Sequence, residues 1–230
     1  MSTDSLTVIS SMATRHVLTQ LAQTYEAVSG QHVSIVSVGG IEAARRIQEG
    51  ERFDVVVLAS DAIDRLERNG HVISGSRVGV ARSEVAVAIK HGEPRPDVSS
   101  ESALRDAVLR ARTIGYSTGP SGTHIINLLR KWGIADVIAD RIVEARPGVP
   151  VGSLVAEGKV ELGFQQLSEL VHEPGIDMVG MLPAAIQAVT VFSAAICATS
   201  ERQEAAKAFL DHLGSADGDQ VKIAHGMAPV

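Results

Sequence analysis

Short apolar runs rich in β-branched residues alternate with helical patterns, and this alternation restricts the fold more than any other feature of the sequence. The strand-like runs span 6–10, 32–38 and 54–58, and the helical segments that follow them span 13–28, 41–49 and 61–69. Repeated strand–helix–strand units predict parallel sheets flanked by helices. The expected fold class is therefore α/β.

Two long extended segments, at 77–90 and 188–199, enclose the middle of the chain. Between them, helices are expected at 100–110, 121–132 and 152–157, and strands at 113–117, 142–145 and 160–165. A last amphipathic helix is expected at 201–214, with Ala205, Ala208, Phe209 and Leu213 on its inner face. This pattern predicts one lobe from residues 1–82 plus 193–230 and a second lobe from residues 83–192. The extended segments would be hinge-crossing strands, with a ligand cleft between the lobes.

The composition narrows the classes of function. The chain has 230 residues, of which 45% are hydrophobic and 3% aromatic, and its net charge is −6. Few aromatic residues and an acidic balance argue against a nucleic-acid partner. An anionic ligand would need local hydrogen-bond donors, because the overall charge repels it. The single cysteine, Cys197, is expected to be a small buried hydrophobe.

No cofactor or metal ion is expected. The eight histidines show no metal-ligand spacing, and the sequence contains no P-loop, no GxGxxG motif after the first strand and no GxSxG elbow. The N-terminal stretch MSTDSLTVIS lacks the basic and apolar regions of a signal peptide, and no apolar run is long enough for a membrane span. The sequence as written therefore predicts a cytoplasmic protein without membrane insertion, or a periplasmic one if a leader was removed.

Three strand-to-helix junctions carry serine, alanine or glycine. In a parallel sheet these junctions share the carboxyl edge, where ligands bind, and each offers free N–H groups at a helix start. A single junction of this kind is most simply an N-cap or a turn, but three at one edge favour a site. The predicted ligand-binding residues in this lobe are Ser10, Ser11, Gly39, Gly40, Ala59 and Ser60.

The second lobe repeats the pattern at the helix starts GPSGTH (119–124) and VGS (151–153). Donors from helix starts in two lobes could hold a small oxyanion or a compact carboxylate by hydrogen bonds alone. The predicted ligand-binding residues here are Ser121, Gly122, Thr123 and Val151.

The order of these motifs resembles the type II periplasmic-binding-protein fold, and within it the molybdate-binding periplasmic protein family. The marks are the strand ending in Ser11, the Gly39–Gly40 turn, the DVVVLAS run (54–60), the PSG helix start and the EGKVELGF run (157–164). The resemblance implies that Ser11, Gly39, Ala59, Ser121, Gly122 and Val151 line the site. It also implies an ABC transporter membrane component as a partner.

Three departures from that family suggest a different ligand. Gly39 or Gly40 stands where molybdate binders have serine, Gln165-Gln166 stands where they have tyrosine, and the hinge segment carries Arg82. The segments Ala81-Arg82-Ser83 and FQQLSEL (164–170) are similar to a side branch of the family that includes aconitate isomerisation.

Four further residues are therefore candidates for ligand binding or catalysis: Arg82, Ser83, Gln165 and His124. Arg82, with Ser83 beside it, could grip a carboxylate in a bidentate pair, or could be a surface arginine paired with Glu84. Gln165 could bind ligand oxygens. His124 could act as a base on an acidic C–H, or could be an ordinary surface histidine.

Three functions remain open at this point. The first is a solute-binding protein for a small anion, the second is a cofactor-independent isomerase of a small polycarboxylate, and the third is a cytosolic anion sensor.

Overall fold

The computed structural model describes residues 5–230; residues 1–4, the start of the N-terminal stretch discussed above, lie outside it. The chain forms two compact units. Among the described residues, unit 1 comprises 5–82 together with Val191–Val230, and unit 2 comprises Ser83–Thr190. Both boundaries fall inside long strands, β4 (Val78–Lys90) and β9 (Val189–Ile196). A ligand cleft between the units stays a prediction.

The sheet of unit 1 is built around β1 (Leu6–Ser11). This strand pairs in parallel with β2 (Val33–Val38) on one side and with β3 (Val55–Ala59) on the other, so that Val8 lies opposite Ile35 and Val55. On its far side β3 pairs antiparallel with β9. The apolar residues of β1 and β3 are almost fully buried except Ala59 at the end of β3, as their continuous apolar runs require.

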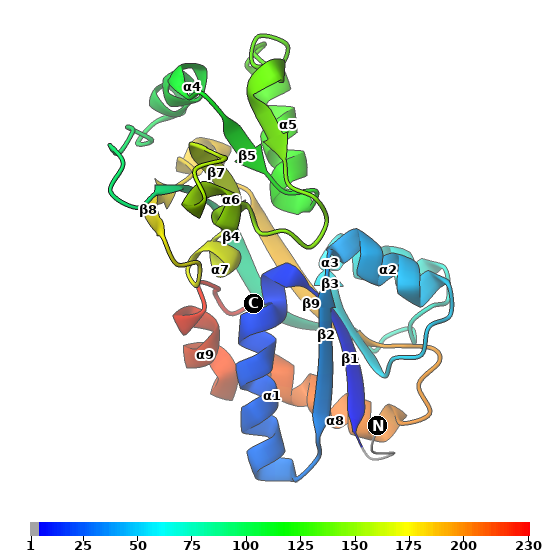
Figure 1. The fold of residues 1–230 in the computed structure, drawn as a ribbon. Coiled ribbons are helices and arrows are strands. Elements are labelled where there is room, and N and C mark those ends of the chain that lie inside the picture. Colours follow the sequence, from blue (N-terminus) through cyan, green and yellow to red (C-terminus); the bar gives the residue numbers. More distant parts are fainter. Residues whose placement is uncertain (1–4) are drawn as a thin grey trace. The chain divides into compact units, whose positions relative to one another are not determined.

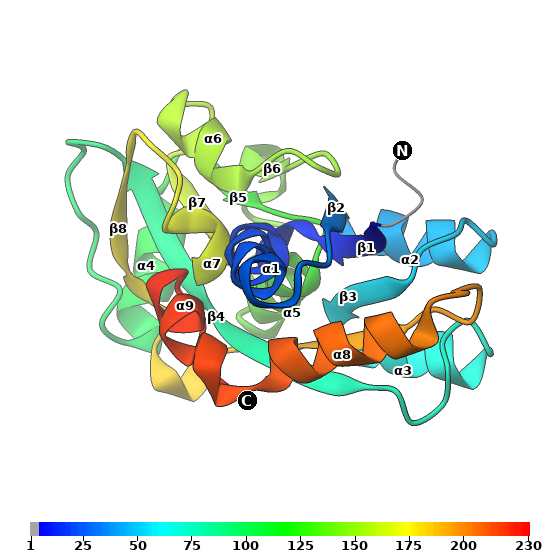
Figure 2. The same ribbon diagram turned by 90° about the horizontal axis from the view of Figure 1, so that it is seen from below.

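Helices cover both faces of this sheet (Figures 1 and 2). α1 (Arg15–Ser29) and α8 (Gln203–Gly214) belong to one apolar cluster, and α9 (Asp219–Ala224) contacts α1. α2 (Gly40–Gln48) and α3 (Ser60–Arg68) belong to the cluster on the opposite face. The expected inner face of α8 is partly wrong: Ala208 is exposed, and Ala206 and Leu210 are buried with Phe209 and Leu213.

The sheet of unit 2 is built around β5 (Ile114–Tyr116), which pairs in parallel with β6 (Ile142–Glu144) and β7 (Leu162–Gln166). β4 pairs antiparallel with both β7 and β8 (Ile176–Met181). One face carries α4 (Glu101–Arg110) and α5 (Pro120–Lys131), and the other carries α6 (Val151–Ala156) and α7 (Leu167–Leu170). The described residues also form four 3-10 turns, at Met12–Thr14, Ala139–Arg141, Ala184–Ile186 and Ala216–Gly218.

The α/β fold class is confirmed, and the sheets are mixed rather than purely parallel because β4, β8 and β9 run antiparallel to their neighbours. The cap expected at Ser100 is present, since its hydroxyl accepts a hydrogen bond from the Ala103 N–H at 3.1 Å. One strand and two α-helices were not predicted from the sequence, β8, α7 and α9, and neither were the 3-10 turns. From residue 5 onward, no helix is both long and apolar enough to cross a membrane.

Candidate functional site: the carboxyl edges of two sheets

The predicted ligand-binding residues of unit 1 lie together at one sheet edge. β1, β2 and β3 are parallel and end at Ser11, Val38 and Ala59. The first two junctions touch, because a Cβ atom added at Gly40 would lie 3.8 Å from the Cβ atom of Ser11. A methyl group at position 40 would thus make ordinary van der Waals contact with Ser11.

The serine hydroxyls at this edge are joined to other serines and threonines. Ser10 Oγ lies 2.8 Å from Ser37 Oγ, and Ser11 Oγ lies 3.4 Å from Thr14 Oγ1. Ser11 precedes the first helical turn but its side chain makes no capping hydrogen bond. Its hydroxyl is therefore not committed to the helix start, which leaves it suited to bind a ligand.

The third junction, between β3 and α3, does not have the serine cap expected from the sequence. Ala59 takes the N-cap position of α3, so the interpretation of Ser60 as an N-cap is wrong. Ser60 Oγ instead lies 2.7 Å from Ser193 Oγ of β9. Arg77 Nε donates to the same Ser193 hydroxyl at 3.2 Å, and its guanidinium forms an ion pair with Asp64. The sequence analysis missed Ser37, Ser193 and Arg77, because these contacts join strands that are distant along the chain.

The side chain of Arg82 is exposed, and the backbone of this residue exchanges two hydrogen bonds of 2.8 Å with Ala228. Within residues 5–230 no ion pair joins Arg82 to Glu84, so the paired-surface reading is wrong. Ser83, between them, is buried and its Oγ accepts from the Ser168 N–H at 3.4 Å. Successive side chains of β4 point to opposite faces of the strand, so the buried Ser83 and the exposed Arg82 lie on different sides. A role of Arg82 in ligand binding stays a prediction.

The parallel strands of unit 2 also bring predicted site residues to one edge. α5 begins directly after the loop that follows β5, and a Cβ atom at Gly122 would lie 1.5 Å from the carbonyl oxygen of Ser117. Only glycine fits there. Ser121 is buried and its hydroxyl lies 3.3 Å from Ser117 Oγ, whereas the Thr123 hydroxyl donates to the Gly119 carbonyl at 3.3 Å.

Gln165 uses both ends of its amide group within the protein. Its Oε1 accepts from the N–H groups of Val151 and Gly152, at 2.9 and 3.3 Å, and its Nε2 donates to Glu169 Oε2 at 2.6 Å. The expectation placed the Val151 N–H and the Gln165 amide against a ligand. In the structure they bond to each other, because the start of α6 lies over the end of β7.

Glu169 was not among the predicted residues. Burial raises the pKa of its carboxyl group to about 7, and the hydrogen bond from Gln165 opposes this shift. At neutral pH the group is therefore shared between its acid and carboxylate forms. The four-residue spacing of Gln165 and Glu169 could have indicated the pair, but only if the strand-to-helix turn between them had been anticipated.

His124 lies in the first turn of α5 and is half-buried. Its Nε2 lies 2.8 Å from the carbonyl oxygen of Ile186. A carbonyl oxygen only accepts, so Nε2 carries the proton and Nδ1 has the lone pair of the neutral ring. His124 is thus an oriented, half-buried side chain, and its role as a base stays a prediction.

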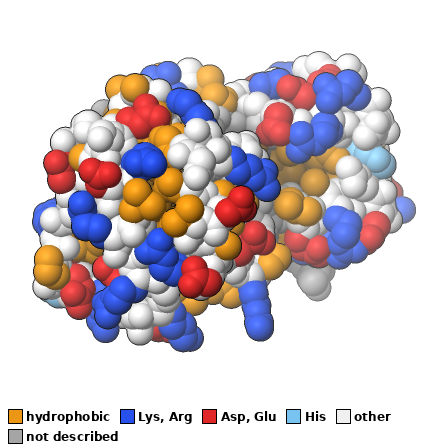
Figure 3. Space-filling view, turned by 90° about the horizontal axis from the view of Figure 1, so that it is seen from above, with side chains coloured by type: hydrophobic (Ala, Val, Ile, Leu, Met, Phe, Trp, Pro, Cys, Tyr) orange, Lys and Arg blue, Asp and Glu red, His pale blue; other side chains and the backbone are white. Residues whose placement is uncertain are grey.

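Other candidate features do not form a site. Burial and the charge of Asp54 raise the pKa of Cys197 to about 12, so the thiol is not a nucleophile. No group of three or more His, Cys, Asp or Glu side chains in the described part of the chain could hold a metal ion. On the face shown in Figure 3, basic and acidic side chains are intermingled.

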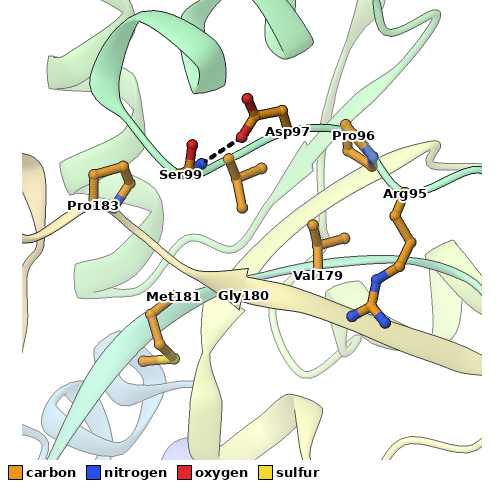
Figure 4. A pocket seen from close by; sticks show the side chains of 9 residues that line it. Arg95, Pro96, Asp97, Ser99, Val179, Gly180, Met181 and Pro183 are labelled. Carbon is orange, nitrogen blue, oxygen red and sulfur yellow. Dashed lines mark hydrogen bonds between the residues drawn. The ribbon is translucent and has the colours of Figure 1, made fainter.

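An open hollow of about 390 Å³ lies beside β8 in unit 2 (Figure 4). Its walls include Arg95, Pro96 and Asp97 on one side and Val179 and Met181 on the other. None of the predicted site residues lines it, and the Arg95 guanidinium is bonded to the Met178 carbonyl. The hollow is therefore separate from the carboxyl edge of the parallel strands.

The two-unit α/β fold with donor-rich strand ends is that of a solute-binding protein. The chain belongs to the bacterial extracellular solute-binding protein family, whose model matches residues 6–228. It is 35% identical to an aconitate isomerase of Pseudomonas sp over 231 residues, which cover 98% of this chain and 88% of that protein. It is 26% identical to the molybdate-binding protein ModA of Azotobacter vinelandii over 218 residues, covering 90% and 82%.

Solved structures show the same fold. The periplasmic molybdate-binding protein of Azotobacter vinelandii matches with a TM-score of 0.82 and 23% identity, covering 98% of this chain and 99% of that one. The tungstate ABC transporter protein of Geobacter sulfurreducens matches with a TM-score of 0.74 and 14% identity, covering 95% and 97%. The resemblance to a type II, molybdate-binding-protein-like fold is thereby confirmed.

Proposed function

We propose that this protein binds a compact polycarboxylate and interconverts isomers of aconitate without a cofactor. The observation that carries the proposal is the 35% identity to an aconitate isomerase along 98% of the chain. From the sequence alone, simple binding came first and isomerisation second; this similarity reverses that order.

The donor arrangement in unit 2 supports a ligand other than a bare tetrahedral oxyanion. A small oxyanion site depends on free N–H groups at helix starts. Here the first two N–H groups of α6 already donate to Gln165, and this residue in turn bonds to Glu169. The helix start is therefore joined to an acid that titrates near neutral pH, a feature that suits proton transfer better than oxyanion capture.

The proposed reaction is an allylic proton shift. A base removes a proton from the saturated carbon beside the double bond, the C–H electron pair forms a new double bond, and the original double bond takes up a proton at its far carbon. The base must accept a proton near neutral pH. Glu169 is one candidate because its pKa is about 7. His124 is the other candidate on geometric grounds, because the Ile186 carbonyl holds the Nε2 proton and leaves the lone pair at Nδ1.

Proton exchange tests the proposal directly. Purified protein is incubated with cis- or trans-aconitate in heavy water and followed by NMR. Interconversion of the isomers with deuterium incorporated at the allylic carbon is expected. H124Q should lower kcat by about 100-fold or more, while H71Q, at a histidine outside both strand edges, should leave it unchanged. Absence of both exchange and interconversion in the folded wild type would rule out the isomerase.

Oxyanion binding is the second candidate function, favoured by the molybdate-binding relative and by the Ser11 hydroxyl, which makes no capping hydrogen bond. A thermal-shift panel of molybdate, tungstate, sulfate, phosphate and di- and tricarboxylates separates the two. A ligand at 100 times its Kd adds about 2.7 kcal/mol of stability. A response to molybdate or tungstate alone would favour the transport-type binder, whose partner would be an ABC transporter membrane component.

A further inference from the structure

Two buried polar atoms, one at the end of β7 and one in the following helix α7, have no hydrogen-bond partner within residues 5–230. They are Gln166 Oε1 and Ser168 Oγ, and each residue is only 2% exposed. Buried polar atoms are almost always paired in folded proteins, because an unpaired one loses its bonds to water without replacement. Two of them within three residues therefore point to a partner that the chain itself does not supply.

The surroundings hold both residues in place. Gln166 is the last residue of β7, where its backbone pairs with Val85 of β4, and its Nε2 donates to Thr190 Oγ1 at 2.7 Å. The Ser168 N–H donates to Ser83 Oγ at 3.4 Å. With one end of the amide bound to Thr190, the other end is fixed at the carboxyl edge of the parallel strands, where ligands bind in such sheets.

The chemistry of these atoms restricts what can bind. An amide oxygen only accepts hydrogen bonds, whereas a serine hydroxyl both donates and accepts. A fully deprotonated carboxylate or oxyanion has no proton to give to Gln166. We propose that Gln166 and Ser168 form a subsite for an O–H group of the ligand, which donates to Gln166 Oε1 and accepts from Ser168 Oγ. This proposal rests on the proposed carboxylate-binding function and adds a specificity to it.

Two kinds of ligand present such a group: a polycarboxylate that keeps one carboxyl protonated, and a hydroxy acid. At a pH above the pKa of that carboxyl group, the polycarboxylate must take up a proton in order to bind. The hydroxy acid already carries its O–H proton and takes up none. Other titratable side chains nearby must be separated from this effect. They are Glu169 on α7, His124 on α5, and Arg82 and Glu84, which flank Ser83 on β4 and are exposed.

Calorimetry in two buffers of different ionisation enthalpy, at pH 8, counts the protons bound with each ligand. Wild type should take up roughly one proton per trans-aconitate and none per citrate. Q166L should weaken both ligands about tenfold or more and abolish the uptake. S168A should weaken both by a smaller factor and should fold normally, because it removes an unpaired buried hydroxyl. E169Q should retain the uptake, and Q203L, an exposed glutamine on α8, should match wild type.

Three results would overturn the subsite. Q166L and S168A could both bind as tightly as wild type, in which case the two atoms serve only a structural water. Proton uptake could persist in Q166L and vanish in E169Q, which would assign it to Glu169. Tight aconitate binding could proceed without any uptake, which would mean that the amide presents Nε2 to a carboxylate. In all three cases wild type still binds aconitate, so the proposed function survives; binding of neither carboxylate by wild type would overturn both.

Discussion

The buried carboxyl group of Glu169 gives one side chain a measurable effect on stability. Its pKa rises from 4.5 to about 7 on folding because burial disfavours the charged form. Between these two values the unfolded chain has released the proton and the folded chain still holds it. The free energy of unfolding therefore falls as the pH rises from about 4.5 to about 7, and stays low above that.

E169Q should remove this pH dependence. The glutamine oxygen can still accept from Gln165 Nε2, but it carries no charge to bury. At pH 8 the variant should be more stable than wild type by up to about 3 kcal/mol, and at pH 4 the two should converge. Urea unfolding at pH 4, 5, 6, 7 and 8 measures the difference in unfolding free energy between the variant and wild type. The two proteins share every other titratable group, so the contributions of those groups cancel in this difference. A difference that does not vary with pH would contradict the assignment.

G122A should disrupt the start of α5. The new methyl group would lie 1.5 Å from the Ser117 carbonyl oxygen, which is backbone and cannot move without displacing the turn. We expect a loss of about 3 kcal/mol or more, measured by urea unfolding. G119A is the matched control, because its methyl group would lie 3.6 Å from the nearest atom, the Ser117 hydroxyl. Equal stability of the two variants would contradict this account of the turn.

At the level of elements, the start of α6 depends on a side chain from β7. Gln165 accepts from two consecutive backbone N–H groups that no preceding turn can satisfy. Q165A should leave them buried and unpaired and cost about 2 kcal/mol. Q48A, at an exposed glutamine in α2, should cost a few tenths. Both variants are measured in the same urea titration. If Q165A loses no more unfolding free energy than Q48A, water replaces the Gln165 amide at the two N–H groups.

The local elements were predictable where a single periodicity decided them. The apolar runs of β1 and β3 and the Ser100 cap of α4 are properties of neighbouring residues. β8 was missed because IDMVGM has no regular alternation, and every residue in it is only half-buried. α7 was missed because four residues are too few to show a helical period.

The candidate site was predictable only in part, for a related reason. The strand-end positions followed from the parallel order of the strands, as with Ser11, Gly40 and Ser121. The hydrogen-bond partners of the site residues could not be predicted in this way. Ser60 meets Ser193 across 133 residues, and Gln165 meets Val151 across a helix and a strand. Such contacts depend on the tertiary arrangement, which no local pattern encodes.

Over the whole molecule, the two units present similar chemistry from different stretches of chain. Each has a parallel core whose carboxyl edge carries buried serines, Ser10 and Ser11 in unit 1 and Ser121 in unit 2. Such an edge supplies hydrogen-bond donors locally, which an acidic protein of net charge −6 needs in order to bind an anion. The proposal made from the sequence, a ligand cleft between the lobes, requires a single ligand to use both edges.

Two single substitutions test that proposal. If one ligand bonds to both units, S11A and S121A should each weaken aconitate binding by about tenfold, since each removes one hydroxyl from a charged ligand. S102A, an exposed serine on α4, should leave the affinity unchanged. Isothermal titration gives the three values, and urea unfolding confirms that the variants are folded. If S121A lowers the affinity and S11A does not, or the reverse, the ligand is held by one unit alone, and the cleft predicted from the sequence is not its binding site.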